Sequence, residues 1–152
     1  MKQFSLLIPL IIVIILNGCQ HCVQYNTIEN DITFDNIKED FYSDIGIDVS
    51  HINIGFVDEL KGEAVANCVY YPINASKNFI KVKRSWWKGA TDILRKALIY
   101  HELGHCAILY YDHINNLRPD RCPVSLMHSY VINSYCLQRH WYEYITQLEG
   151  LK

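Results

Sequence analysis

The spacing of apolar residues along the chain predicts three helices and three strands. Apolar residues at helical spacing predict a first helix within residues 28–43, and Gly46 ends that region. Apolar and polar residues then alternate over residues 51–57, and this period of two predicts a strand with one buried face. Residues 63–71 and 78–82 are predicted as the second and third strands.

The second predicted helix has an apolar face that continues into two histidines. It begins after Thr91, which suits the N-cap position, and Asp92 suits the first turn because the helix dipole favours a carboxylate there. One face of this helix carries Leu94, Ala97, Leu98, His101 and His105. A third helix is predicted from Asn133 or Ser134 to about Leu148. Strands followed by a helix, a loop and a last helix indicate an α+β domain.

The composition is that of one ordinary globular domain. A chain of 152 residues has the length of a single domain. The net charge of -2 and the absence of a basic run argue against nucleic acid as a partner. No repeat or low-complexity linker divides the chain, so we expect residues 31–152 to form one domain that acts as a monomer.

The first residues resemble the signal of a bacterial lipoprotein. Residues 1–18 contain one lysine and an apolar run, Leu6–Leu16, that is too short to span a bilayer and suits a signal peptide. The Leu-Asn-Gly-Cys sequence that ends at Cys19 resembles the lipobox, which implies cleavage before Cys19 and its lipidation. Residues 19–30 would then be a lipidated tether in the bacterial cell envelope, at the outer membrane or cell surface. An ordinary secretory signal with a free Cys19 thiol is the alternative.

His101, Glu102 and His105 belong to the sequence HELGH, which is the HExxH pattern. Residues four positions apart lie on one face of a helix, so the two imidazoles can bind one zinc ion. Glu102 lies one position further round the helix and can reach a water at the open position of the metal, as a general base does. The pattern therefore predicts a hydrolytic site with Zn²⁺ as its cofactor.

Beyond His105, the sequence resembles the metzincin branch of zinc metalloproteases. The resemblance covers residues 91–149 and rests on the HExxH helix, the later His113, and a Ser-Leu-Met sequence at Met127 ahead of the last helix. It implies a small zincin-like domain, with strands, an active-site helix, a Met-containing turn beneath the metal and a C-terminal helix. The site residues that it implies are the zinc ligands His101, His105 and His113, the base Glu102, and Met127 in the turn.

The third zinc ligand stays open at this point. His113 follows His105 by eight positions, and an unbroken helix would separate the two by roughly 12 Å along its axis. The helix must therefore end near residues 107–110, and we attribute the break to polar residues within 110–116, a stretch without glycine. In order of preference, the candidates are His113, Asp112, His128 and, well below these, Glu143.

An exported chain meets an oxidising compartment, so we expect its cysteines to form disulfides. Five cysteines remain besides Cys19, and we leave Cys22 in the tether as the unpaired one. Cys106 lies about 100° round the helix from His105 and therefore points away from the metal. Connectivity does not follow from sequence. Our hypothesis pairs Cys68 with Cys106, and Cys122 with Cys136.

These features together predict a lipid-anchored, zinc-dependent metallopeptidase that acts on proteins or peptides. Residues 78–84 could form an edge strand that pairs with an extended peptide. The alternative is a non-catalytic, zinc-stabilised surface lipoprotein that binds a partner. Glu102 argues against this alternative, because a structural zinc site closes its coordination sphere and needs no base.

Overall fold

The computed structural model describes residues 28–152 of the chain. The expected signal peptide, Cys19, Cys22 and most of the tether lie outside this part. Within it, none of the helices has the length and apolar character that a membrane crossing requires. The elements in chain order are η1 (Ile32–Phe34), α1 (Asp35–Ile45), β1 (Asn53–Val57), β2 (Ala66–Val69), η2 (Ala75–Lys77), β3 (Phe79–Lys83), α2 (Arg84–Gly89), α3 (Asp92–Cys106) and α4 (Ser134–Glu149).

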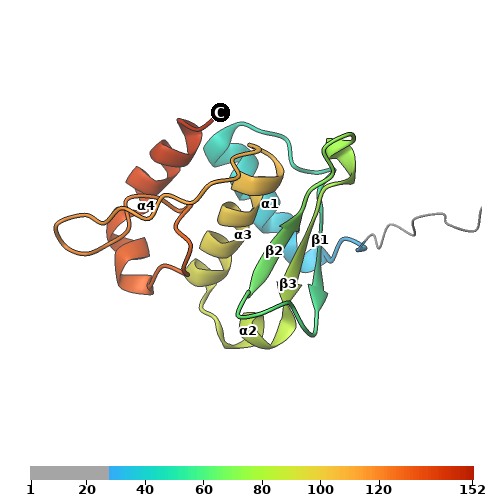
Figure 1. Ribbon diagram of the computed structural model, residues 1–152, viewed down its shortest axis with the longest axis horizontal. Helices are drawn as coiled ribbons and strands as arrows, with labels where there is room; N and C mark the ends of the chain where they lie inside the picture. Colours follow the sequence, from blue (N-terminus) through green and yellow to red (C-terminus); the bar gives the residue numbers. More distant parts are fainter. Residues whose placement is uncertain (1–27) are drawn as a thin grey trace, which may run out of the picture.

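Strand β3 is the centre of a three-stranded mixed sheet (Figure 1). It pairs in parallel with β1, where Ile54 lies opposite Ile80, and antiparallel with β2, where Cys68 lies opposite the same residue. The prediction that residues 78–84 form an edge strand is therefore wrong, since β3 is paired on both sides. Alternation along this segment reveals a strand with a buried face, but alternation does not encode the order of strands in a sheet.

The outer edge of β1 is covered by the first residues of the described chain. The Asp31 N–H donates to the Ile54 carbonyl at 2.9 Å. Gly55 permits this close approach, because a Cβ at that position would lie only 2.7 Å from the Glu29 carbonyl oxygen. The outer edge of β2 instead forms one wall of a cleft.

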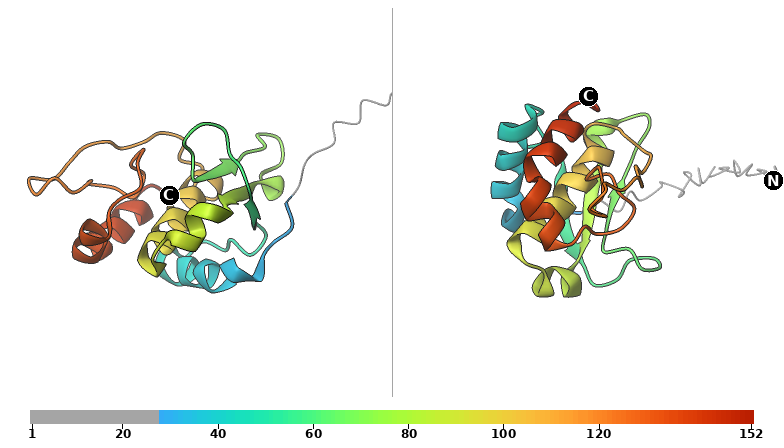
Figure 2. Two further views of the ribbon diagram at one scale, coloured as in Figure 1. Left: turned by 90° about the horizontal axis from the view of Figure 1, so that it is seen from below. Right: turned by 90° about the vertical axis from the view of Figure 1, so that its left-hand side faces the viewer.

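Helices α1, α3 and α4 lie on one side of the sheet, and α3 contacts the sheet, α1 and α4 (Figure 1, Figure 2). The middle of α3 is enclosed, with Ile99, Tyr100 and Leu103 fully buried. Interiors of proteins are close-packed, so a helix surrounded in this way holds its side chains in fixed positions. The two histidines of the HExxH pattern therefore project from a helix that is enclosed by the sheet, α1 and α4.

The α+β class is confirmed, and each predicted helix and strand overlaps an observed one. α1 ends at Gly46, whose φ of 76° is easily adopted by glycine. Asn133 caps α4, since its side chain accepts the Cys136 N–H at 2.9 Å. The short helix α2 was not predicted; it precedes α3 as a separate element and is held by the buried Trp87.

Two disulfides join the helices to the rest of the fold, and they are the two pairs expected. Cys68–Cys106 links β2 to the last residue of α3, with the Cα atoms 5.7 Å apart. Cys122–Cys136 links the long loop before α4 to the first turn of that helix, with the Cα atoms 5.4 Å apart. A disulfide restricts the unfolded chain and typically contributes about 2–4 kcal/mol to stability.

Candidate metal centre

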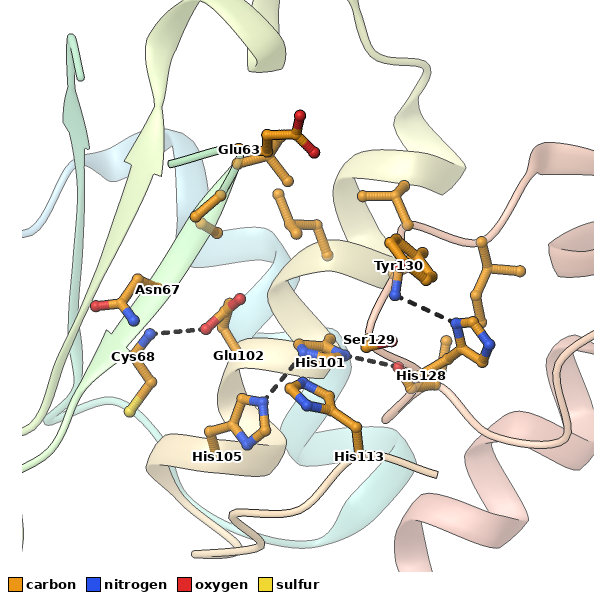
Figure 3. A pocket seen from close by; sticks show the side chains of 18 of the residues that line it. Glu63, Asn67, Cys68, His101, Glu102, His105, His113, His128, Ser129 and Tyr130 are labelled. Carbon is orange, nitrogen blue, oxygen red and sulfur yellow. Dashed lines mark hydrogen bonds between the residues drawn. The ribbon is translucent and has the colours of Figure 1, made fainter. Parts of the chain in front are cut away.

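His101 and His105 meet on one face of α3, with their Nε2 atoms 3.1 Å apart. Ligand nitrogens about 2.0–2.1 Å from a tetrahedral zinc ion lie roughly 3.3 Å from each other. The observed separation is close to this value. The two side chains are therefore already arranged as neighbouring ligands of one ion (Figure 3).

The opposite ring nitrogens of the two histidines are tied to backbone carbonyls. His101 donates from Nδ1 to the Leu126 carbonyl at 2.7 Å, and His105 donates from Nδ1 to the Tyr110 carbonyl at 2.6 Å. A carbonyl only accepts, so Nδ1 carries the proton in both rings and Nε2 keeps its lone pair. This pattern fixes the tautomer and orientation that a metal ligand needs.

His113 joins this pair because α3 stops at Cys106. Leu109 then takes a φ of 62°, in the left-handed region, and the Tyr110 N–H donates to the Gly104 carbonyl at 3.1 Å. The chain turns back, and the His113 ring stacks on the His101 ring with centroids 5.3 Å apart. One ligand nitrogen from each of the three histidines lies within 4.8 Å of the others.

The helix therefore ends where the ligand distance requires, but the break is not made where the sequence suggested. It lies at Leu109 and not in the polar residues 110–116. A non-glycine residue in the left-handed conformation costs about 1–2 kcal/mol. Glycine enrichment is the sequence signal for such a turn, and it is missing here.

Asp112, His128 and Glu143 do not belong to the three-histidine group. His128 lines the nearby cleft, and its Nδ1 accepts the Tyr130 N–H at 3.2 Å. Glu143 lies beside His140 on α4, with 3.9 Å between its carboxylate and the ring. Among the three candidates favoured from sequence, the geometry selects His113.

A second group of donors within the described residues consists of Asp120, Cys122 and His140. The Cys122 sulfur is bonded to Cys136 and cannot act as a thiolate ligand. His140 and Asp120 instead contact each other directly, with 2.7 Å between Nε2 and Oδ2. We therefore assign this group to the packing of the loop against α4.

Glu102 points to the other side of the histidine pair, towards β2 (Figure 3). Its Oε2 accepts the Cys68 N–H at 2.7 Å, and the residue is only 6% exposed. Burial raises the pKa of Glu102 to about 7, while the hydrogen bond from the Cys68 N–H acts in the opposite direction. A carboxyl group with a pKa near neutrality can both accept and return a proton, which suits acid–base catalysis.

The histidines favour the form that binds metals. Burial lowers the pKa of His101 to about 4 and also lowers the pKa of His105. Both imidazoles are therefore neutral at pH 7 and offer a nitrogen lone pair. Three imidazole nitrogens, two of them on rings oriented by backbone carbonyls, form a donor set that fits Zn²⁺ well.

Met127 lies in the loop between His113 and α4 and packs against the helix that carries the histidine pair. It is fully buried, and its side chain packs against Gly104 in the HExxH helix. The Met127 carbonyl also accepts the Ile114 N–H at 2.7 Å. Met127 therefore connects α3, through its contact with Gly104, to the segment that carries His113.

The contact with Met127 explains why residue 104 is a glycine, and we expect a Gly104→Ala variant to be destabilised. A Cβ at this position would overlap the Met127 sulfur. Overpacking of a close-packed core typically costs about 1–3 kcal/mol. Denaturant titration of the metal-free protein measures the loss. Gly89→Ala is the control and should keep its stability, because nothing lies within 4 Å of a Cβ there. If the two variants are equally stable, the packing of Met127 against Gly104 does not contribute to holding the site in place.

The groups that hold the centre in place carry no motif of their own. The loop is fixed by Ser125, whose hydroxyl donates to Gln147 Oε1 at 2.6 Å and accepts the Met127 N–H at 2.9 Å. The end of α3 is fixed by the buried Asn78, whose side chain donates to the Cys106 carbonyl at 2.9 Å. Sequence reasoning assigned no supporting role to the Ser125 hydroxyl or to Asn78, whereas Met127 was expected in the turn and Gly104 is recognisable as a glycine inside a predicted helix.

A cleft of about 550 Å³ opens in front of the histidines and Glu102. One wall is formed by β2 and the residues before it, and the other by the loop that follows Met127 (Figure 3). The residues that line it include Glu63, Ala66, Cys68, Ala97, Leu98, Leu126, Tyr130 and Ile132. A ligand can therefore approach the three histidines from the side that the protein leaves free.

No family model, curated protein or solved structure matches this chain.

Proposed function

We propose that this protein is a zinc-dependent metallopeptidase of metzincin-like architecture. The observation that carries the proposal is the grouping of His101, His105 and His113 in an open cleft beside the buried Glu102. Three protein ligands with one free position are typical of catalytic zinc, whereas structural zinc has four protein ligands. The same feature argues against a non-catalytic lipoprotein that uses zinc only for stability.

Each residue of the site has a distinct part in the proposed reaction. The three histidines hold the ion, and zinc supplies a Lewis acid that activates water and polarises the carbonyl of the scissile peptide bond. Glu102 accepts the proton of the attacking water and then passes it to the leaving amine. The Cys68 N–H keeps the Glu102 carboxylate on the β2 side of the cleft, next to the histidines.

The wall that β2 presents to the cleft supports a proposal for the class of substrate. The Lys83 N–H donates to the Val65 carbonyl, so Val65 faces β3. In an antiparallel ladder these roles alternate along the strand, so the main chain of Ala66 faces away from β3. An extended peptide can add to such an edge through backbone hydrogen bonds. Proteins or peptides in extended conformation are therefore the substrates that we propose.

Metal analysis combined with a peptide-cleavage assay tests this function. We expect one zinc ion per purified chain and cleavage of members of a broad peptide library. Removal of zinc by a chelator should abolish cleavage, and added zinc should restore it. A protein that binds zinc but cleaves no peptide would support the non-catalytic alternative. A protein that binds no zinc would contradict both proposals.

We further propose that a lipid on Cys19 anchors the protein in a bacterial cell envelope, at the outer membrane or cell surface. In that case a Cys19→Ser variant should lose its lipid mass and its stable association with membranes. Mass spectrometry of the membrane fraction decides this. Cys22→Ser is the matched control, because it changes a nearby cysteine outside the lipobox. A mature N-terminus elsewhere, without lipid, would indicate simple secretion.

A further inference from the structure

Helix α3 carries two pairs of functional side chains that are offset by one residue. His101 and His105 meet at the metal centre, whereas Glu102 and Cys106 both reach β2. Members of each pair are four positions apart and lie one above the other. One residue turns the helix by about 100°, so the two pairs occupy neighbouring faces. The second pair converges on a single residue of β2, Cys68.

Cys68 is therefore held by α3 at two points. Its N–H donates to Glu102 Oε2 at 2.7 Å, and its sulfur is bonded to Cys106. β2 is a four-residue edge strand that pairs only with β3. The Cys68 N–H points to the other, unpaired edge of β2. The sheet itself holds β2 from the opposite side only. The disulfide starts from the Cys68 side chain and is the covalent connection between β2 and the helix that carries Glu102.

We propose that the Cys68–Cys106 disulfide positions Glu102 for catalysis, in addition to stabilising the fold. The disulfide sets the separation of β2 and α3 at which the Cys68 N–H can orient the Glu102 carboxylate. A glutamate has three rotatable side-chain bonds, so one hydrogen bond in a buried place selects one orientation among several. The role of Glu102 as base rests on the proposed function, whereas the coupling between disulfide and carboxylate does not.

Without this disulfide the end of α3 keeps its other attachment. Asn78 still donates to the Cys106 carbonyl and ties the helix to the start of β3. We therefore expect a Cys68→Ala/Cys106→Ala variant to fold, with β2 no longer covalently fixed to the helix. The matched control is Cys122→Ala/Cys136→Ala, which removes the disulfide of the loop and α4 and leaves β2 unchanged.

NMR on the ¹⁵N-labelled, metal-free mature chain measures whether the hydrogen bond between Glu102 and the Cys68 N–H depends on the Cys68–Cys106 disulfide. A hydrogen bond to an ionised carboxylate is shorter and stronger than a neutral one. At a pH above the Glu102 pKa of about 7, Glu102→Gln should therefore move the residue 68 amide proton upfield. We expect this shift in the chain with both disulfides and in the Cys122/Cys136 variant. It should be absent when Cys68 and Cys106 are replaced. A shift of equal size in all three backgrounds would overturn the proposal.

Kinetics on the zinc-loaded protein provide the second test. Misplacement of a catalytic group by about 1 Å can cost up to roughly a hundredfold in rate. We expect the Cys68/Cys106 variant to lose about tenfold to a hundredfold in kcat, with KM changed less than about twofold. The Cys122/Cys136 variant should keep its kcat. Equal losses of kcat in the two variants would reduce the Cys68–Cys106 disulfide to a purely stabilising role.

The design also covers a variant that does not fold and a wild-type protein that has no peptidase activity. If the alanine pair does not fold, Cys68→Ala/Cys106→Val restores volume at the buried Cys106, and the same measurements apply. If the wild-type protein hydrolyses no peptide, the proposed function fails. The NMR comparison still decides whether the disulfide orients the Glu102 carboxylate.

Discussion

Replacement of Glu102 by glutamine is expected to leave a folded, zinc-binding protein whose peptide hydrolysis is slower by roughly 10²–10⁴-fold. A glutamine amide cannot accept the proton of the attacking water. Its oxygen can still accept the Cys68 N–H, so the local structure should persist. The buried carboxylate is costly to ionise, as its raised pKa shows, so the neutral glutamine should not lower the stability.

The measurement is a comparison of kcat, zinc content and thermal unfolding for the wild type and two variants. Glu63→Gln is the control, because Glu63 also lines the cleft but is exposed and has no contact with the histidines among the interactions described above. We expect Glu63→Gln to keep kcat within about twofold of the wild type. A Glu102→Gln variant that cleaves as fast as the wild type would exclude Glu102 as the base.

The sequence predicts the helix of the candidate site well because its signals are local. A spacing of four residues places His101 and His105 on one helix face, and the offset of one residue turns Glu102 towards another wall. Both follow from the geometry of any α-helix. The structure adds the partners of these side chains, which come from distant segments such as Leu126 and Cys68.

Predictions that depended on long-range order were less successful. Residues 78–84 alternate like a strand, but the order of strands depends on which neighbours pair with them, and β3 lies in the centre. The end of α3 was predictable from the distance that a third ligand must cover. The turn at Leu109 was not, because its unfavourable backbone conformation is sustained by the surrounding fold and not by the local sequence.

The second large effect is expected at the third ligand. A His113→Ala variant should bind zinc at least about a hundredfold more weakly than the wild type. Loss of a group that merely orients a ligand typically costs 10–100-fold in metal affinity, and loss of the ligand itself should cost more. The variant should change zinc binding and leave the stability of the metal-free fold unchanged, because His113 is exposed and does not belong to the buried core.

Stability measurements separate loss of the metal from damage to the fold. For the metal-free proteins, we expect wild type and His113→Ala to differ by less than about 0.5 kcal/mol, as is usual for exposed residues. Added zinc should raise the unfolding temperature of the wild type, because a ligand that binds only the folded state stabilises it. The same zinc concentration should have a much smaller effect on His113→Ala.

Asp112→Ala and His128→Ala are the matched controls, since both residues lie near His113 in the sequence or the cleft but outside the three-histidine group. A competition assay with a zinc-binding dye gives Kd for all three variants. We expect the controls to weaken zinc binding by less than about tenfold. Normal zinc binding by His113→Ala, with a large loss in one control, would transfer the role of third ligand to that residue. In that case the turn at Leu109 would not serve to place His113 as a metal ligand, and its unfavourable backbone conformation would need another explanation.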